Sequence, residues 1–321
     1  MNLLICSAGR RVKLVKYFRE ELSKLGGNII AIDCDLTAPA LQYANISEVV
    51  PRITDINYVN VIKQLCSKYN IDAILSLIDP ELNILAEHKN DFEKANIKII
   101  VSNKEVVDIC FDKYLTYQFL KINDLPRVPT YISKDEALHD IRKNLLQLPL
   151  IVKPRRGSAS LGVSIINSIE ELNVAWNNTK DLVIQPFITG HEYGVDCYVD
   201  LIKVKATHIF GKRKVKMRAG ETDKSIAVKD EKLFYLIEQL VDALKPIGPI
   251  DIDCFKTETN YIISEINPRF GGGYPHAHEL GQNFVKNIIN NLCGESVKEK
   301  IGSYPDGSIM VKYDDVLILN G

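Results

Sequence analysis

The N-terminal third of the chain alternates short apolar runs with helical segments, and this alternation restricts the fold more than any other feature of the sequence. The apolar runs have the length of strands that are covered on both faces. We predict strands at 2–6, 28–35, 71–78 and 97–102, and amphipathic helices at 12–25, 58–69 and 80–96. Strands that alternate with helices in this way are typical of a parallel, doubly wound sheet.

Three polar segments follow these predicted strands: "SAGRR" at 7–11, "DCD" at 33–35 and "DPE" at 79–81. Open α/β sheets bind ligands at the carboxyl ends of their strands, so we expect these segments to border a site. Each segment alone also has the simpler interpretation of a polar turn. "SAGRR" lacks the G-x-G-x-x-G spacing of a dinucleotide-binding turn, which argues against a nicotinamide-dependent Rossmann enzyme.

The pattern changes after residue 105. A predicted helix at 110–125 stops at Pro126, and short strands, one helix and long antiparallel strands follow. We therefore predict an α/β domain at 1–108 and an α+β domain at 109–321. The second domain divides into two α+β subdomains, at about 112–186 and 187–321, and no low-complexity linker separates them.

Composition excludes several classes of protein. Lys and Arg number 40 and Asp and Glu 41, so the net charge of −1 gives no overall attraction to nucleic acid or membranes. No apolar run approaches the roughly 18 residues of a membrane span, and "MNLLIC" lacks the basic start of a signal peptide. The 7 cysteines contain no C-x-x-C pair, which favours reduced, mostly buried thiols over a disulfide framework or a cysteine nucleophile. We expect a cytoplasmic protein without a nucleic-acid or membrane partner.

The segment "IDIDCFKTETNYIISEINP" (250–268) predicts a hairpin with its turn at 257–260. Side chains alternate along a strand, so the hairpin can bring Asp253 beside Glu265 and Asn267. Buried carboxylates need a neutralising cation, and hard oxygen ligands suit Mg²⁺, with Mn²⁺ as an alternative. The simpler interpretation is a set of surface carboxylates at a hairpin edge.

Two further segments carry groups that suit phosphates. "NPRFGGG" (267–273) places Arg269 next to the hairpin carboxylates, where its guanidinium can hold a phosphate or carboxylate in two-point contact. Its glycines, Gly272 among them, allow the backbone to approach a ligand closely. In "VKPRRGSASLGV" (152–163), Lys153 precedes a Gly/Ser-rich loop that can turn N–H groups toward phosphate oxygens. Together these segments favour phosphoryl transfer, although each alone is equally well a solvated turn.

The segment "QPFITGHE" (185–192) lies between them. A strand exit with apolar side chains can bind a flat adenine, and Glu192 can accept hydrogen bonds from ribose hydroxyls. A strand–turn–strand corner explains the same residues without a ligand.

These segments, in order and spacing, resemble the ATP-grasp enzymes. The resemblance rests on "FDKYLTYQF", "LIVKPRRGSASLGV", "LVIQPFITGHEYGVDCYV", "GPIDIDCF" and "YIISEINPRFGGG". It is greatest to the carbamoyl-phosphate-synthase large-subunit-like group, and it extends to "SAGRR" and "LIDPEL" of the first domain, which look like the pre-ATP-grasp domain. The resemblance implies ATP and Mg²⁺ as cofactors and three sets of site residues. The implied ATP-binding residues are Lys113, Lys153, Ser158, Ser160, Gly162, Gln185, Pro186, Phe187, Ile188 and Glu192. The implied metal ligands are Asp253, Glu265 and Asn267. The implied catalytic residues are Lys153, Asn267 and Arg269.

The activity implied by the resemblance is an ADP-forming ligation. A small-molecule carboxylate takes the γ-phosphoryl group of ATP, and an amine, or alternatively a thiol, then displaces phosphate from the acyl phosphate. The chain resembles one ATP-grasp unit, whereas full carbamoyl-phosphate synthase large subunits look like two. Bicarbonate phosphorylation within a split enzyme and a non-catalytic ATP sensor remain the alternatives. One departure from the family is Asp253, where a longer glutamate or glutamine is usual.

The substrate residues are predicted from position alone. A polar pocket can form from Arg10, Arg11, Asp79 and Glu81 of the first domain and from Arg218, Glu221, Gly272 and His276 of the second. Arg218 can bind a carboxylate and Glu221 an amine, while His276 has a structural role as its simpler interpretation. "GKRKVK" (211–216) is interpreted as a solvated strand, because it lacks the interleaved aromatic residues of a nucleic-acid patch. A homodimer is compatible with the first domain.

Overall fold

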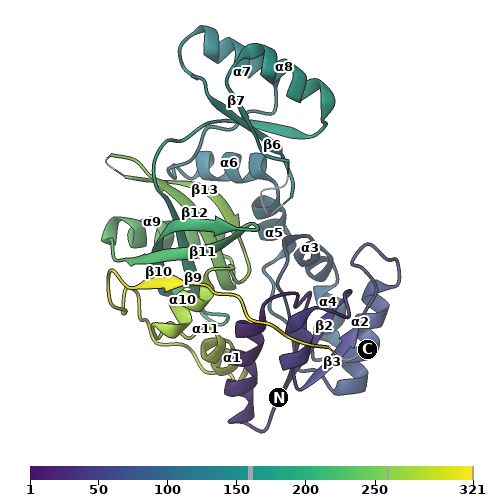
Figure 1. Ribbon diagram of the computed structural model, residues 1–321. Coiled ribbons are helices and arrows are strands. Elements are labelled where there is room, and N and C mark those ends of the chain that lie inside the picture. Colours follow the sequence, from purple (N-terminus) through teal and green to yellow (C-terminus); the bar gives the residue numbers. More distant parts are fainter. Residues whose placement is uncertain (158–161, 259, 320–321) are drawn as a thin grey trace.

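The computed structural model describes residues 1–157, 162–258 and 260–319. Figure 1 shows three lobes: an N-terminal sheet with its helices, a central antiparallel sheet, and a small lobe at the opposite end of the molecule. The elements of the N-terminal lobe are β1 (Asn2–Cys6), α1 (Val12–Ser23), β2 (Asn28–Asp33), the 3-10 helix η1 (Pro39–Tyr43), β3 (Ile46–Val49), α2 (Tyr58–Tyr69), β4 (Ala73–Ser76), α3 (Asp79–Glu87), α4 (Lys89–Lys94) and β5 (Lys98–Ile99).

The N-terminal sheet is parallel, with strand order β3-β2-β1-β4-β5. Successive side chains of β1 enter two different cores, because the sheet is covered on both faces. Leu3 and Ile5 belong to the core that includes Phe18 of α1, whereas Leu4 belongs to the core that includes Ile62 of α2. The predicted doubly wound sheet is confirmed. The predicted helix at 80–96 is two helices, α3 and α4, which meet at His88.

The central sheet has strand order β13-β12-β9-β10-β11-β14, with antiparallel pairing throughout. One face packs on α9, as Val195, Ile209 and Ile252 share a core with Leu236 of that helix. The opposite face carries the polar residues of the candidate site. The elements are β9 (Glu192–Val199), β10 (Ala206–Arg218), β11 (Glu221–Val228), α9 (Glu231–Leu244), β12 (Gly248–Lys256), β13 (Tyr261–Asn267), α10 (Tyr274–Glu279), α11 (Phe284–Leu292) and β14 (Ile309–Val311).

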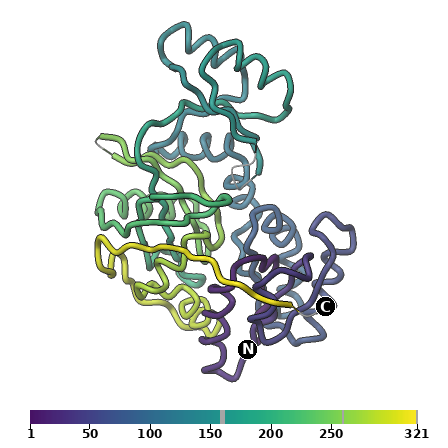
Figure 2. The backbone as a smooth tube through the Cα atoms, in the orientation of Figure 1, coloured from purple at the N-terminus to yellow at the C-terminus, as the bar shows by residue number. Residues whose placement is uncertain are grey.

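The small lobe is a three-stranded sheet of order β7-β6-β8 with two helices. Val152, Leu172 and Ile184 form its separate core. Its elements are α7 (Lys134–Arg142), β6 (Leu150–Pro154), β7 (Ser164–Ile166), α8 (Ile169–Asn178) and β8 (Leu182–Pro186). The backbone trace in Figure 2 shows this lobe projecting from the central sheet, and shows the C-terminal segment running from β14 back toward the N-terminal lobe.

Two helices, α5 (Lys104–Phe111) and α6 (Lys113–Ile122), join the N-terminal lobe to the rest. The single helix predicted from residue 110 is wrong, because Asp112 adopts an extended conformation between the two helices. Residues 217–225 belong to a β10–β11 hairpin in which Arg218 lies opposite Glu221. The hairpin predicted at 250–268 is confirmed, since Thr257 N donates to Asn260 O across its turn at 2.8 Å. None of the described helices is long and apolar enough to cross a membrane.

Candidate active site

The β12–β13 hairpin places its acidic residues as predicted. Asp253 lies opposite Glu265, and Asp251 lies opposite Asn267. The next strand, β9, continues this polar face, because Asp251 also lies opposite Asp196. One surface of the central sheet therefore carries carboxylates on three adjacent strands, and they need nearby cations for stability.

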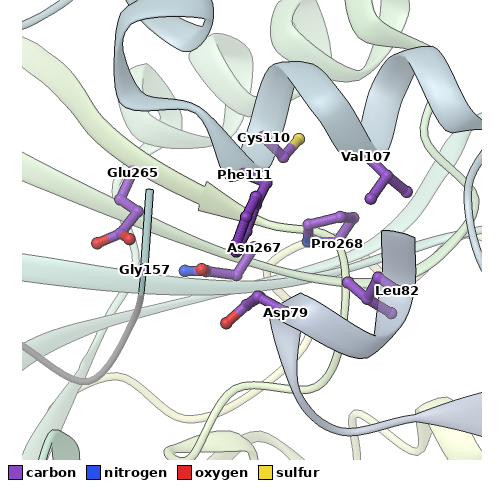
Figure 3. Close-up of a pocket in the computed structure, with 9 residues that line it drawn as sticks. All are labelled: Asp79, Leu82, Val107, Cys110, Phe111, Gly157, Glu265, Asn267 and Pro268. Carbon is purple, nitrogen blue, oxygen red and sulfur yellow. The ribbon is translucent and has the colours of Figure 1, made fainter. Parts of the chain in front are cut away.

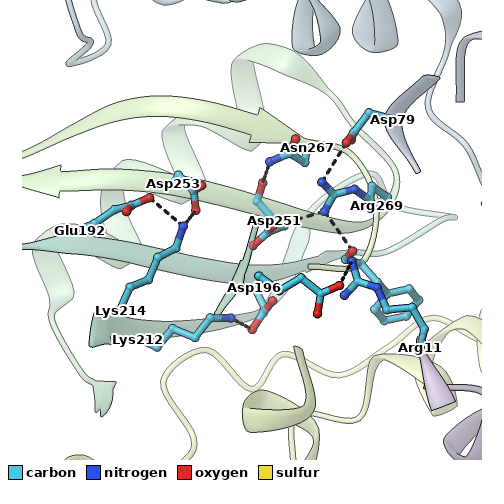
Figure 4. A network of polar contacts seen from close by, with 12 residues as sticks. Arg11, Asp79, Glu192, Asp196, Lys212, Lys214, Asp251, Asp253, Asn267 and Arg269 are labelled. Carbon is cyan, nitrogen blue, oxygen red and sulfur yellow. Dashed lines mark hydrogen bonds and ion pairs between the residues drawn. The ribbon is translucent and has the colours of Figure 1, made fainter. Parts of the chain in front are cut away.

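Lys214 of β10 supplies one of these cations. Its Nζ lies 2.8 Å from Glu192 Oε1 and 2.6 Å from Asp253 Oδ1, with 7% of the side chain exposed (Figure 4). Burial lowers the pKa of Lys214, but the carboxylates of Asp253 and Glu192 outweigh this effect and raise it. Gly194 of β9 makes the arrangement possible, because a Cβ there would lie 3.1 Å from the Cε of Lys214. Lys214 thus bridges Glu192, the residue implied to hold the ribose, and Asp253, an implied metal ligand.

Lys212, two residues earlier on β10, pairs with Asp196 in the same manner and is 1% exposed. The interpretation of this strand as solvated is therefore wrong for both Lys212 and Lys214. The side-chain alternation of the strand directs both ammonium groups toward the polar face of the sheet.

Arg269 lies between the N-terminal lobe and the hairpin. Its Nη2 donates to Asp79 Oδ2 at 2.9 Å, and its Nη1 donates to Asp251 Oδ2 at 3.3 Å and to Phe270 O at 3.1 Å (Figure 4). Burial lowers the pKa of this guanidinium, but the Asp79 and Asp251 carboxylates outweigh it and raise the pKa above its ordinary value. The arginine is therefore charged and fixed by carboxylates from two lobes.

The glycines after Arg269 leave room for this charged network. A Cβ on Gly271 would lie 2.5 Å from the Asp251 carboxylate, and one on Gly272 would lie 2.8 Å from Glu221 Cγ. Glu221 in turn lies 3.4 Å from Arg11 Nη2 and 2.8 Å from Lys312 Nζ. The glycines thus permit close approach, and the atoms that approach them here belong to the protein's own side chains.

Two lysines of the implied phosphate site approach the hairpin from the other side. Lys113 Nζ donates to Gly157 O at 2.9 Å and lies 3.9 Å from Glu265 Oε1. Lys153 lies on β6, and burial lowers its pKa, as does the charge of Lys113. Ser158 and Ser160 lie outside the described residues. Gly162, the first described residue after them, has a φ of 71°.

Asp112 fixes the position of these lysines. Its side chain caps α6, accepting hydrogen bonds from Tyr114 N at 3.0 Å and Leu115 N at 3.1 Å, and Lys113 is the first residue of that helix. Its carboxylate also lies 2.8 Å from Arg155 Nε and 3.0 Å from Arg156 Nη2, just beyond the end of β6. Burial raises the pKa of Asp112, but the Arg155 and backbone hydrogen bonds outweigh it and hold the pKa below its ordinary value.

The predicted adenine segment leaves the small lobe at the end of β8. Gln185 is buried and its Nε2 donates to Thr130 Oγ1 at 2.8 Å, which holds the strand against the preceding loop. After Pro186, Phe187 exposes 37% of its surface, and Ile188 is half-buried. Apolar side chains are thus presented at the strand exit.

The remaining predicted substrate residues are only partly brought together. Arg11, Asp79, Glu221 and Gly272 join the network around Arg269, and Arg10 is exposed beside it. Glu81 is 0% exposed and accepts hydrogen bonds from Ser7, Tyr58 and Ser76, so we leave it out of the proposed site.

Arg218 points away from this network. It pairs with Asp223 at 3.0 Å and with Asp314 at 2.7 Å, at the far end of the β10–β11 hairpin. His276 is buried, with its Nδ1 2.8 Å from Ser225 Oγ. Burial lowers the pKa of His276 to about 4, which leaves the ring neutral at pH 7.

Sequence reasoning missed three residues that complete the site: Lys214, Lys312 and Asp112. Alternation along β10 is a signal for Lys214, and the Asp at the start of a helical segment is a cap signal for Asp112. Lys312 reaches Glu221 from the segment after β14, and no local pattern in the sequence indicates that contact.

The oxygen atoms of the hairpin suit Mg²⁺ in kind, because Asp253, Glu265 and Asn267 offer two carboxylates and an amide oxygen. Among the described residues, no three His, Cys, Asp or Glu side chains converge as a metal site. Ammonium groups instead lie near both carboxylates, Lys214 at Asp253 and Lys113 at Glu265. The donor atoms therefore fit a magnesium ion in kind, and such an ion would replace part of this lysine charge.

Comparison with known families agrees with this geometry. A model of the ATP-grasp domain matches residues 110–273, which span Lys113 through the glycines that follow Arg269. A model described as the PylC-like N-terminal domain matches residues 3–100.

Individual relatives are distant. The chain is 26% identical over 275 residues to a formate-dependent phosphoribosylglycinamide formyltransferase of Prochlorococcus marinus, a match that covers 78% of this chain and 65% of the relative. It is 33% identical over 109 residues to a D-alanine–D-alanine ligase of Corynebacterium aurimucosum, covering 32% of this chain and 31% of the relative. The chain thus spans about two thirds or less of these relatives.

A solved structure shares the whole architecture. The biotin carboxylase domain of Hydrogenobacter thermophilus 2-oxoglutarate carboxylase superposes with a TM-score of 0.75 at 18% identity. The superposition covers 96% of this chain and 73% of that one. That structure is a dimer containing MgADP, ADP and bicarbonate. The expected fold, a pre-ATP-grasp domain followed by an ATP-grasp domain, is confirmed.

Proposed function

Because the chain belongs to the ATP-grasp family, we propose that it is an ADP-forming ligase that joins a small-molecule carboxylate to an amine through an acyl phosphate. One observation carries the proposal. Arg269 is held by Asp79 and Asp251 beside the hairpin that carries Glu265 and Asn267, and Lys113 approaches the same hairpin from the start of α6. Cations thus surround the carboxylates where a transferred phosphoryl group would be neutralised.

The two curated relatives support a carboxylate as the first substrate. Formate and D-alanine, which their names contain, both carry a carboxylate. The structural neighbour that contains MgADP supports the choice of nucleotide and ion.

The proposal assigns roles to residues of this chain. Gln185, Pro186, Phe187 and Ile188 border the adenine, and Glu192 holds the ribose once Lys214 releases it. Lys113 and Lys153 bind the phosphates and withdraw negative charge from the γ-phosphoryl oxygens during attack by the substrate carboxylate. Arg269 holds the acyl phosphate, and the amine then forms the new bond to carbon while phosphate leaves.

Asp253, Glu265 and Asn267 would hold Mg²⁺. The ion, when bound, supplies positive charge at the phosphate oxygens. The acyl phosphate is open to hydrolysis, so closure of the small lobe over the site would protect it from water.

The test is phosphate release from Mg-ATP, with the nucleotide product identified, across pools of carboxylates and amines that include bicarbonate, amino acids and ammonia. We expect one acid–amine pair to stimulate release and ADP to be the product. Arg269→Met is the matched inactive control, because it keeps an unbranched apolar stem and removes the guanidinium charge.

Three results would contradict the proposal. AMP as product would refute an acyl-phosphate mechanism. Activity only with bicarbonate and ammonia would favour carbamoyl-phosphate-type chemistry. ATP binding without turnover in any pool would favour a nucleotide sensor.

We also propose a homodimer, by analogy with the dimeric biotin carboxylase domain. Sedimentation at a monomer's mass would refute this oligomeric state.

A further inference from the structure

Glu81 is a fully buried carboxylate that the proposed mechanism does not use. It lies in the first turn of α3 with 0% of its surface exposed. Three hydroxyl groups donate to it: Ser7 Oγ to Oε1 at 3.1 Å, Tyr58 Oη to the same oxygen, and Ser76 Oγ to Oε2. Burial of a carboxylate is unfavourable unless donors compensate it, so these hydroxyls stabilise Glu81 and are in turn fixed by it.

The first of these hydroxyls begins the loop that connects β1 to α1. Ser7 has a φ of 51°, a left-handed conformation that is uncommon for serine, so contacts must hold it. Gly9 N donates to Asp33 Oδ2 at 2.7 Å, which fixes the middle of the loop to the end of β2. The loop ends at Arg11, whose Nη2 lies 3.4 Å from Glu221 Oε1 of β11. The loop is thus fixed inside the N-terminal lobe, and its end contacts the central sheet.

A second hydroxyl partner, Ser76, ends β4 and leads into α3. Its Oγ accepts a hydrogen bond from Ile78 N at 3.3 Å, so it also fixes the residue just before the helix. The helix begins at Asp79, whose Oδ2 accepts a hydrogen bond from Arg269 Nη2 at 2.9 Å. Figure 3 shows Asp79 at the start of α3, where it lines a narrow recess together with Asn267 of β13. A second segment thus runs from the buried carboxylate to a contact between the lobes.

We propose that Glu81 is a positioning residue: through its hydroxyl partners it holds Arg11 and Asp79 at the contacts that the N-terminal lobe makes with the central sheet. Its third partner, Tyr58, belongs instead to the core that α2 forms on the other side of the N-terminal sheet, and so provides an internal comparison. The consequence for Arg269, and therefore for turnover, rests on the proposed ligase function. The positioning itself does not depend on that function.

A double-mutant cycle tests the positioning without any substrate. Glu221→Gln removes the charge that Arg11 contacts, and we expect it to lower the thermal midpoint of the natural protein by about 2 °C. Ser7→Ala removes one hydroxyl bond to Glu81. In that background we expect Glu221→Gln to lower the midpoint by only about 1 °C, the share that belongs to its contact with Lys312. Substitutions at separate sites that share no partner are additive, so a merely structural Glu81 leaves the two changes additive.

Tyr58→Phe is the matched control, because it also removes one hydroxyl bond to Glu81 Oε1. It should lower the midpoint on its own and leave the effect of Glu221→Gln at about 2 °C. Glu81→Met should reduce that effect as Ser7→Ala does, and Glu81→Gln should restore it, because a hydroxyl can accept from an amide as well as donate to one. The serine variant alters a half-buried residue, so it serves if the methionine variant does not fold.

Turnover provides a second measurement once an acid–amine pair is known. Ser76→Ala should displace Asp79 from Arg269, and we expect it to lower kcat by at least about fivefold while the Kd for ATP stays within about twofold. Tyr58→Phe should leave both constants within about twofold. A general loss of stability would not separate these two variants in this way.

Additive midpoint changes in the Ser7→Ala cycle would overturn the positioning role. An equal reduction of the Glu221→Gln effect in Tyr58→Phe would also overturn it, because any loosening of the lobe would then have the same result. An unchanged kcat in Ser76→Ala would refute the link to Arg269. A screen in which no acid–amine pair is active would refute the ligase but not the positioning, which the cycle decides alone.

Discussion

Asp112 links three parts of the candidate site, and its substitution tests the geometry most directly. The carboxylate caps α6, whose first residue is Lys113, and it pairs with Arg155 and Arg156 beyond the end of β6. Loss of a helix cap costs about 0.5–2 kcal/mol. Loss of a hydrogen bond to a charged group costs about 1.5–3 kcal/mol, and less where the partner regains water.

Exposure of the partners sets the size of the effect. The side chain of Asp112 is 2% exposed, whereas Arg155 and Arg156 are 23% and 50% exposed and can be hydrated when the carboxylate is removed. We expect Asp112→Ala to lower the free energy of unfolding by about 2–4 kcal/mol. Asp112→Asn retains a capping oxygen and loses only the charge, so we expect a loss of about 1–2 kcal/mol.

Urea denaturation followed by circular dichroism measures both values, and calorimetric titration of ATP measures the effect on Lys113. We expect the alanine variant to bind ATP more weakly than the asparagine variant, because only the latter keeps the start of α6 in place. Equal losses of stability in the two variants would refute a capping role. A loss below about 0.5 kcal/mol in the alanine variant would refute both roles of Asp112, as the cap of α6 and as the partner of the two arginines.

Three further predictions follow from the site and its surroundings. Lys214→Met leaves Asp253 and Glu192 without their cation, so MgCl₂ without nucleotide should raise the thermal midpoint of this variant more than that of the natural protein; an equal rise would contradict the bridging role. Lys153→Ala should raise the Kd for ATP or abolish turnover while circular dichroism shows a folded chain; normal turnover would exclude the lysine from the site. Burial lowers the pKa of His208 to about 4, so the unfolded chain binds this proton at higher pH than the folded one. Stability should therefore fall as pH decreases from about 6.5 to 4, less steeply in His208→Gln, in urea melts across that range.

The fold was largely predictable because its signals are local. Buried strands and amphipathic helices alternate in the first lobe, and the β12–β13 hairpin has its alternating carboxylates and polar turn within one short segment. The errors arose where one residue overrides a pattern. The helix predicted at 110–125 includes Asp112, yet this residue is extended, and its carboxylate accepts hydrogen bonds from Tyr114 N of α6 and from the Arg155 guanidinium.

The site was predictable in its hairpin and less so in its contacts between lobes. Asp253, Glu265 and Asn267 follow from alternation and one turn. The contact of Arg269 with Asp79 joins residues 190 positions apart, and that of Lys312 with Glu221 joins residues 91 apart. No periodicity extends over such separations, and only the packing of the N-terminal lobe on the central sheet determines them.

Lys214 shows why a correct strand is not sufficient to locate its side chains. Alternation places Lys212 and Lys214 on one face, but either face is compatible with the sequence of β10. The choice is made by pairing with β9, in which Lys212 lies opposite Gly194 and the strand register shifts between Ala206 and His208. A register different by one residue would direct both lysines to the face packed on α9 and leave the carboxylates of Glu192 and Asp196 without cations. The glycine and the two flanking carboxylates therefore select the register that completes the charged face, which makes the pairing of β9 with β10 itself a determinant of the site.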